Sequence, residues 1–221
     1  MAQISGLMSK KNKFIIVNKR MCFSKEVSLA TFIMGLFTSY LCLTVGTPEY
    51  NVIGFFFGFV ILMQGIEYIL WKHQLCDSLN KNVSLFGMIL NHLQPVILFI
   101  LLAVYLKTDN IDLFVLGLYL LVIIPYSIQF LRDKNCTVKN DKDHLVWKWN
   151  QMNKGAFVYI IFLLALCVMG RHVNKTFSII TLASFVISYF IYRRDDVIGA
   201  MWCFFAVFAP LFYYIKHKMK K

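Results

Sequence analysis

Seven long apolar runs follow one another from residue 28 onward, and short connectors between them carry most of the charged residues. The runs cover residues 28–45, 52–71, 83–105, 111–130, 156–169, 177–192 and 197–215. About 20 apolar residues in a helix match the roughly 30 Å hydrocarbon core of a bilayer. Inside that core, backbone polar groups must bond within their own segment, which favours helices. The sequence therefore predicts an all-α polytopic membrane protein, a bundle of about seven transmembrane helices.

Composition agrees with this class and limits the choice of partners. Hydrophobic residues make up 59% of the 221 residues and charged residues 15%, more apolar surface than a soluble domain can hide. The net charge of +12 comes from Lys and Arg in the tails and connectors, where they meet anionic lipid headgroups. We therefore expect the lipid bilayer and its anionic headgroups as partners and no nucleic acid. Whether the protein also forms a homo-oligomer is left open by the sequence.

The chain divides into three parts. Residues 1–20 are a basic tail, expected to be disordered, because their apolar patch is too short for the apolar region of a signal peptide. Residues 21–215 form the transmembrane bundle, and residues 216–221 form a second basic tail. Met21 is an alternative functional start. The run at 156–169 is short for a full crossing, so whether it crosses stays open.

Lys and Arg are divided unevenly between the two sides of the predicted bundle. With seven crossings, the side of the N-terminus holds 16 of them and the opposite side holds 7. The positive-inside rule then predicts a cytoplasmic N-terminus, although the basic C-terminal tail argues against it. Three cysteines fall on that predicted cytoplasmic side and are expected to be reduced: Cys22, Cys76 and Cys136. Three others lie within apolar runs as buried thiols: Cys42, Cys167 and Cys203.

Small residues recur at helical spacing in three runs. In the first run they draw one narrow face: Ser24, Ser28, Thr31, Gly35, Thr38 and Cys42. Gly54 and Gly58 form a similar pair in the second run, and serines with a threonine repeat the pattern in the sixth. Such faces let helix backbones approach closely, so we favour helix packing over a polar pore lining.

Polar side chains inside the second and third runs are harder to explain by packing alone. Gln64, Glu67 and Trp71 share one helical face. A carboxylate inside a run normally faces the bundle interior, pairs or is protonated. Snorkelling toward the interface, or bonding to Lys72 or His73, is an equally weighted alternative for Glu67.

The third run places Asn91, His92 and Gln94 directly before Pro95. A proline in a helix frees the carbonyl four residues earlier and bends the helix. A histidine and a carboxylate on adjacent helices are the parts of a proton relay. We therefore predict a polar pocket or conduction path with these members: Gln64, Glu67, Trp71, Asn91, His92 and Gln94.

No catalytic or cofactor pattern emerges, so we predict no enzyme, no cofactor and no metal. The last run has no lysine for a retinal Schiff base, and the five histidines are scattered without a repeated pair. The longest connector carries Trp147 and Trp149 between lysines. Tryptophans near lysines suit the headgroup layer, which predicts a short interfacial helix there.

The first half of the chain resembles an uncharacterised family of small multi-pass membrane proteins, found in microbes and in large DNA viruses, that open with Met-Cys-Trp/Phe-Ser. The matching residues are Met21-Cys22-Phe23-Ser24, Gln64-x-x-Glu67-x-x-x-Trp71 and Leu93-Gln94-Pro95. The resemblance implies a seven-helix fold and residues 1–20 as an extension. It implies no activity.

Two hypotheses follow. The first is a small channel or transporter for protons or a small polar solute, which uses the predicted pocket. The second is a non-transporting scaffold or membrane-remodelling protein, in which the polar residues specify helix packing. An intramembrane lipid enzyme ranks last, because a nucleophile–base pair is not recognisable. We favour the first slightly.

Overall fold

The computed structural model describes residues 24–132, 136–140, 143–150, 152–193 and 197–220, so the predicted tail 1–20 lies outside the described residues. Along the chain the elements are α1 Lys25–Leu43, α2 Pro48–Lys72, α3 Ser78–Tyr105, α4 Asn110–Arg132, β1 Val138–Lys139, β2 Leu145–Val146, η2 Lys148–Asn150, α5 Met152–Gly170, α6 Lys175–Tyr192, α7 Ile198–Ala206 and α8 Phe208–Lys218. As predicted, the fold is all-α over the described residues, apart from one pair of two-residue antiparallel strands. Among the described residues, six segments are long and apolar enough to cross a membrane, and α7 with α8 is one of them.

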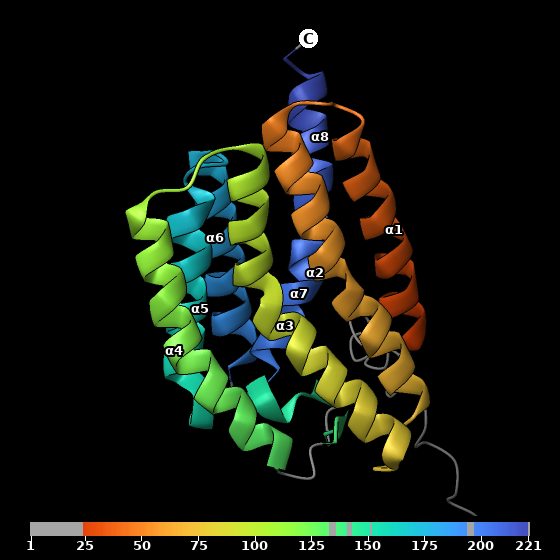
Figure 1. Cartoon of the computed structure of the whole chain (residues 1–221). Coiled ribbons are helices and arrows are strands. Elements are labelled where there is room, and N and C mark those ends of the chain that lie inside the picture. Colours follow the sequence, from red (N-terminus) through yellow and green to blue (C-terminus); the bar gives the residue numbers. More distant parts are fainter. Residues whose placement is uncertain (1–23, 133–135, 141–142, 151, 194–196, 221) are drawn as a thin grey trace, which may run out of the picture.

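The shorter seventh segment is α5. Its described apolar part is Phe157–Gly170, below the length of a full crossing. The ribbon nevertheless runs beside α4 and α6 from one end of the bundle to the other (Figure 1). The chain therefore begins at one end of the bundle, here called the N-terminal end, and finishes at the opposite, C-terminal end.

Helix starts lie a few residues before the predicted apolar runs, because polar residues cap them. The side chains of Ser24, Thr47, Asp77 and Asn174 each accept a hydrogen bond from a backbone N–H three residues later. Such capping satisfies amides that otherwise lack a partner within the helix. Apolar content alone cannot locate these caps, so the predicted starts of these four helices fall inside the true helices.

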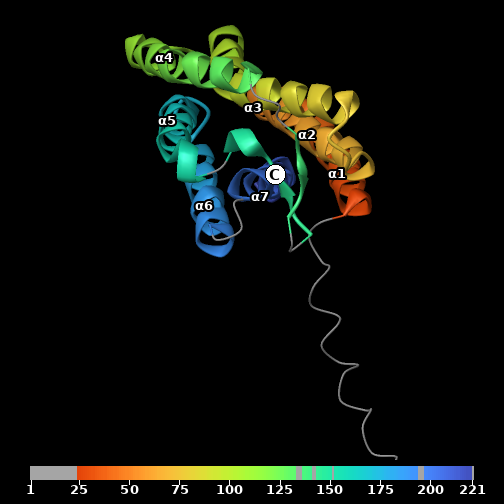
Figure 2. The ribbon, with the colours of Figure 1, turned by 90° about the horizontal axis from the view of Figure 1, so that it is seen from below.

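Seen from the N-terminal end, α4, α3, α2 and α1 form a curved row, and α5, α6 and α7 lie on its inner side (Figure 2). Each helix packs on its neighbour in the chain, and α8 returns to α1. The thiol of Cys42 on α1 donates to the carbonyl of Pro210 on α8 at 3.2 Å across this closure. The bundle is thus built mainly from neighbours in the sequence and closed by its last helix.

The small-residue face of α1 packs against α2, as predicted. Its buried members are Ser28, Thr31, Gly35, Thr38, Ser39 and Cys42. Gly54 of α2 lies so close to α1 that an added Cβ would be 2.9 Å from the carbonyl oxygen of Ser39. The small-residue face is therefore a close contact between two helices. Small residues permit such a close approach of helix backbones in a membrane.

Gly35→Ala is expected to destabilise the bundle by about 1–3 kcal/mol, the usual cost of overpacking. A Cβ at Gly35 would collide with the side chain of Ile61, which is only 1% exposed and has little room to move. Gly58→Ala is the matched control, because its Cβ would meet only Ser39 Cβ at 3.8 Å. Unfolding in mixed detergent micelles measures both variants, and equal losses would contradict this account.

Helix α3 changes direction near its middle (Figure 1), and Pro95 lies inside it. Proline has no N–H to bond the carbonyl of Asn91, so this turn loses a helical hydrogen bond. In the same turn, the carbonyl of His92 accepts a hydrogen bond from the hydroxyl of Tyr119 at 2.6 Å. Helix α4 thus supplies a donor at the bend that the proline introduces.

The connector between α4 and α5 differs from the prediction. Instead of an interfacial helix it forms the β1–β2 hairpin and the short 3₁₀ helix η2, with Val138 paired to Val146. Trp147 and Trp149 are 1% and 2% exposed, and their rings stack at 5.4 Å. We call the described residues 136–140 and 143–150 the Trp hairpin. The expectation of tryptophans in the headgroup layer was wrong, because the connector folds back into the bundle.

A disulfide joins Cys76, in the α2–α3 connector, to Cys136 at the start of the Trp hairpin. The expectation that these two cysteines are reduced was therefore wrong. Cys42 and Cys203 are buried and free, as expected, while Cys167 is half-buried. Cys22 lies outside the described residues. The pairing was missed because 60 residues separate the two cysteines and only the folded connectors bring them together.

Candidate functional site

Three of the predicted polar residues gather between α2, α3 and α7. Gln64, Glu67 and Gln94 are 1%, 7% and 4% exposed. Glu67 lies near Gln64 and near Cys203 of α7, and Cys203 in turn lies near Gln94 of α3. The hydroxyl of Thr31, on α1, lies 3.0 Å from Oε1 of Gln64. We call these five residues the polar cluster, and four helices supply them.

Lys72, one of the alternative partners predicted for Glu67, has another contact in the structure. The ammonium of Lys72 lies over the ring of Tyr68, 4.7 Å from its centre. Glu67 itself is buried in the bundle interior rather than extended toward the end of α2. Trp71, the remaining predicted member on α2, is half-buried and packs at the edge of an apolar cluster around Leu70.

His92 and Asn91 are also buried, but His92 turns toward α4. Its Nδ1 lies 2.8 Å from the hydroxyl of Ser127, which donates to the carbonyl of Ile123. Its ring lies 6.0 Å from that of Tyr126. Glu67 and His92 therefore have different partners. The reason is that His92 and Gln94 project from different sides of α3. Gln94 is two positions after His92, which is about 200° around a helix.

Several buried nitrogens of this region make no hydrogen bond of good geometry among the described residues, although Gln64 lies beside Glu67 and Gln94 beside Cys203. They are Nε2 of Gln64, Nε2 of Gln94 and Nε2 of His92. A buried polar group without a partner costs about 1–3 kcal/mol. Groups of this kind are usually satisfied by a buried water or by a ligand. The interior of the bundle therefore has unmet hydrogen-bonding capacity.

Two small cavities adjoin these groups. The first, of about 30 Å³, is lined by Gln94, Cys203, Thr181 and Ser184 among apolar residues. The second, of about 10 Å³, is lined by residues that include His92. A buried water needs roughly 10–15 Å³ measured in this way. The cavities therefore suit single water molecules and are too small for a larger solute in this conformation.

Trp202 of α7 lines both cavities. Its indole N–H donates to the hydroxyl of Ser184 on α6 at 2.9 Å. Its ring also meets those of Phe162 and Phe185 edge-on, at 5.4 and 5.2 Å. The side chain is thus held by these contacts, and it is shared by the cavity beside Gln94 and the cavity beside His92.

The Trp hairpin closes the N-terminal end of the polar cluster. Its tryptophans pack on the apolar neighbours of Gln64 and Glu67 on α2, in a cluster that also contains Cys203. The carbonyl of Trp149 accepts a hydrogen bond from Tyr126 at 2.8 Å. The two buried indole rings therefore cover the apolar neighbours of Glu67 on this side.

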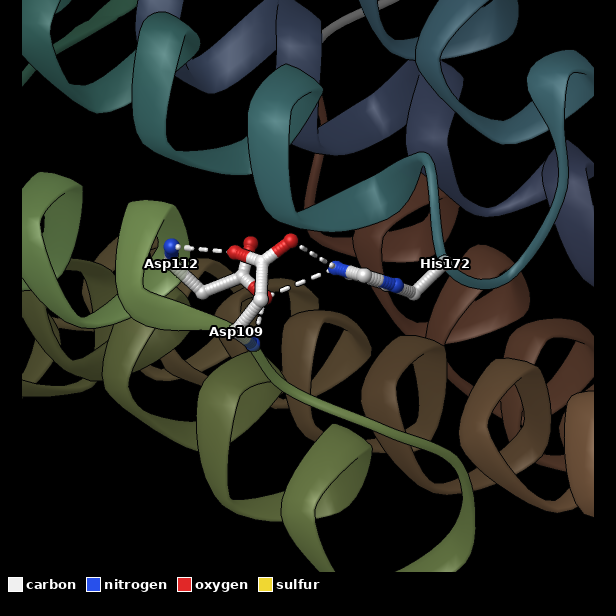
Figure 3. A group of neighbouring side chains, drawn as sticks. All are labelled: Asp109, Asp112 and His172. Atoms are coloured by element: carbon white, nitrogen blue, oxygen red, sulfur yellow. Dashed lines mark hydrogen bonds and ion pairs between the residues drawn. The ribbon is translucent and has the colours of Figure 1, made fainter.

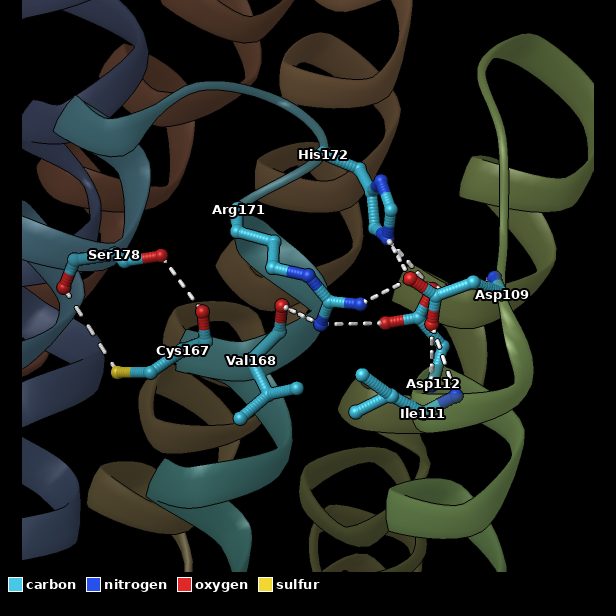
Figure 4. Close-up of polar contacts among 8 residues, drawn as sticks. All are labelled: Asp109, Ile111, Asp112, Cys167, Val168, Arg171, His172 and Ser178. Atoms are coloured by element: carbon cyan, nitrogen blue, oxygen red, sulfur yellow. Dashed lines mark hydrogen bonds and ion pairs between the residues drawn. The ribbon is translucent and has the colours of Figure 1, made fainter.

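A second group of titratable residues lies at the C-terminal end, where the α3–α4 and α5–α6 connectors meet. Figure 3 shows Asp109 and Asp112 facing His172, whose Nε2 lies 2.7 Å from Oδ2 of Asp112. Arg171 bonds to both carboxylates, at 2.6 Å to Asp109 and 3.0 Å to Asp112 (Figure 4). We call these four residues the charge clamp. The Asp112 side chain is fully buried.

The two aspartates also cap α4. Asp109 accepts hydrogen bonds from the backbone N–H groups of Ile111 and Asp112, and Asp112 accepts one from the N–H of Asp109. This reciprocal bonding is the arrangement of a capping box. On the other side of the clamp, Arg171 donates to the carbonyl of Val168 at the end of α5. The clamp therefore ties the start of one helix to the end of the next.

The electrostatics of the clamp follow from this geometry. A hydrogen bond from the Arg171 guanidinium, aided by backbone N–H groups, lowers the pKa of Asp109 to about 2. The same bond raises the pKa of Arg171 above its usual value. Both groups therefore stay charged through the physiological range.

Asp109, Asp112 and His172 hold ligand atoms within 4.8 Å of one another, a spacing that a metal ion can use. The guanidinium of Arg171 already bonds to both carboxylates, however, and supplies the positive charge that a cation would bring. A metal would have to displace Arg171, so we interpret the group as an ion-pair clamp.

Stability is expected to depend on Asp109 at low pH. Because folding lowers its pKa, the carboxylate stabilises the fold fully above its unfolded pKa of about 3.9. This contribution is lost as the pH falls through about 2. Thermal unfolding of the wild type and of Asp109→Asn between pH 5 and 2 checks this. The gap between the two midpoints should close toward pH 2, and a constant gap would contradict the assignment.

Sequence reasoning missed the clamp and Cys203 as a neighbour of Glu67. Asp109 and Asp112 have the spacing of a helix cap, and Asp112 is the second residue of a predicted run, which was a usable signal. Arg171 and His172 fall in the next connector on the same side of the bundle. Cys203 had no such signal, because its contact with Glu67 depends on the rotation of α7.

Comparison with known proteins finds no match: no protein-family model, no curated protein and no solved structure resembles this chain significantly.

Proposed function

We propose that this multi-pass membrane protein conducts protons, with the polar cluster as the conducting site and Glu67 as the group that exchanges the proton. A carboxylic acid buried among amides and a thiol in a transmembrane bundle is a functional-site hypothesis by default. The observation that carries the proposal is the set of buried, unpartnered nitrogens beside water-sized cavities.

The size of the cavities favours protons over a polar solute. A proton passes along hydrogen-bonded waters and side chains, so it needs no space beyond single water sites. The first cavity, of about 30 Å³, adjoins Gln94 and Cys203 of the polar cluster. The second adjoins His92 and also has Trp202 in its lining. We infer a path from Glu67 past Gln94 and Trp202 to His92, along the two cavities that Trp202 lines.

Two further expectations belong to this proposal. Anionic lipid headgroups bind the basic connectors and Lys216, Lys218 and Lys220 at the end of α8. We also propose that the chain belongs to the family with the Met-Cys-Trp/Phe-Ser opening, which implies a shared fold and no activity.

The experiment is a proton-flux measurement. Purified protein is placed in proteoliposomes with a pH-sensitive dye inside, and a proton gradient or a valinomycin-driven potassium potential is applied. We expect dye responses above those of empty liposomes, with no matching flux of sodium or chloride. Absence of flux under both driving forces would refute the proposal and favour a scaffold, in which the polar cluster only specifies helix packing.

A further inference from the structure

The disulfide between Cys76 and Cys136 is part of an ordered structure at the N-terminal end of the bundle. The two Cα atoms are 5.5 Å apart, within the usual range for a disulfide. The connector between α2 and α3 and the Trp hairpin thereby become covalently joined. The bond is thus built into the fold and does not depend on an encounter of two loose loops.

Hydrogen bonds beside the disulfide hold the same two segments together. The side chain of Asn80 donates to the carbonyl of Thr137 at 2.9 Å and accepts from its N–H at 3.0 Å. The hydroxyl of Ser84 lies 2.9 Å from that of Thr137. Asn80, Ser84 and Thr137 are all fully buried. This network positions Cys136 for bonding with Cys76.

A disulfide of this kind needs an oxidant on its own side of the membrane. Each thiol gives up one proton and one electron when the bond forms. Both electrons pass to the disulfide of an oxidised thiol–disulfide oxidoreductase, which becomes a dithiol. Cytosolic thiol buffers reverse this reaction, whereas secretory and periplasmic compartments support it.

We propose that the N-terminal end of the bundle, with the disulfide and the Trp hairpin, faces an oxidising compartment. The C-terminal end, with the charge clamp and the basic end of α8, then faces the cytoplasm. This orientation is the reverse of the one that the overall Lys and Arg distribution favours. It does not depend on proton conduction.

The charge distribution is the argument against this orientation. The N-terminal side holds 16 Lys and Arg against 7 on the other side. Four of those 7, however, follow the last span directly, and added C-terminal charges can reverse a topology. The positive-inside rule is a bias summed over many residues. A structural disulfide, in contrast, does not persist where thiol buffers are reducing, so we give it more weight.

The first test is thiol trapping on the unaltered chain in a bacterial host with an oxidising periplasm. Cells are dissolved in denaturant with N-ethylmaleimide, which blocks every free thiol. The protein is then reduced and treated with a polyethylene glycol maleimide. We expect two added polymer chains, one each on Cys76 and Cys136, and none after Cys76→Ser or Cys136→Ser. An unmodified wild-type chain would overturn the proposal.

The second test locates the C-terminal end of the bundle with fusions that leave residues 1–221 unaltered. One fusion adds green fluorescent protein after Lys221, and its matched control adds alkaline phosphatase, which needs its own disulfides and works only in the periplasm. We expect fluorescence from the first fusion and no activity from the second. An active phosphatase with a dark fluorescent protein would overturn the orientation.

Discussion

Glu67→Gln is expected to reduce proton flux by about a hundredfold, the lower end of what a positioned proton-transfer group contributes. Glutamine has nearly the same shape and keeps hydrogen-bonding capacity, but it cannot gain and release a proton. The fold should survive, because Glu67 neighbours Gln64 and Cys203 rather than a cationic partner. The dye assay in proteoliposomes measures the change.

The matched control is Glu49→Gln, the same substitution in the same helix. Glu49 is exposed in the first turn of α2, at the other end of the bundle from Glu67. Its replacement should leave the flux unchanged. If both variants conduct like the wild type, Glu67 is not on the path. If Glu67→Gln only lowers thermal stability, the polar cluster is a packing feature.

Asp112→Asn is expected to cost about 3 kcal/mol of folding free energy, near the lower limit for breaking a buried ion pair. The Asp112 side chain is fully buried and bonds to Arg171 at 3.0 Å, so the substitution leaves the guanidinium without its buried partner. The lower limit applies because Arg171 is 35% exposed and water replaces part of the lost interaction. Unfolding in mixed detergent micelles measures the change.

Asp109→Asn serves as the control for Asp112→Asn. Asp109 bonds to the same guanidinium, yet its side chain is 45% exposed, so a clearly smaller loss is expected. Equal losses would show that burial does not decide the strength of the clamp. Stabilisation of the wild type alone by calcium or manganese would instead assign the clamp to metal binding.

The membrane class and most of the helices could be predicted because their signal is local. An apolar run of sufficient length specifies a span wherever the other spans lie, and the small-residue face of α1 shows in its own spacing. The fifth span is the instructive case. Its apolar part is short, yet it packs between α4 and α6. Contacts with these two helices replace part of the contact with lipid.

The Trp hairpin and the disulfide could not be predicted by the same reasoning. Two tryptophans between lysines have the same local pattern whether they meet headgroups or fold into a bundle. The choice depends on the space left between α2, α3 and α7, which no local pattern records. The pocket prediction was limited in a similar way. It placed His92 with Glu67, whereas the rotation of α3 gives His92 a partner on α4.

The position of α7 and α8 has a consequence for biosynthesis. Cys203, a neighbour of Glu67, comes from the last span, so Glu67 lacks this neighbour while the first six spans leave the ribosome. A chain truncated before α7 would present that carboxyl group to lipid or to the insertion machinery. Quality-control proteases recognise exposed polar groups in membrane segments, so a chain that lacks its last helix should be degraded rapidly rather than accumulate.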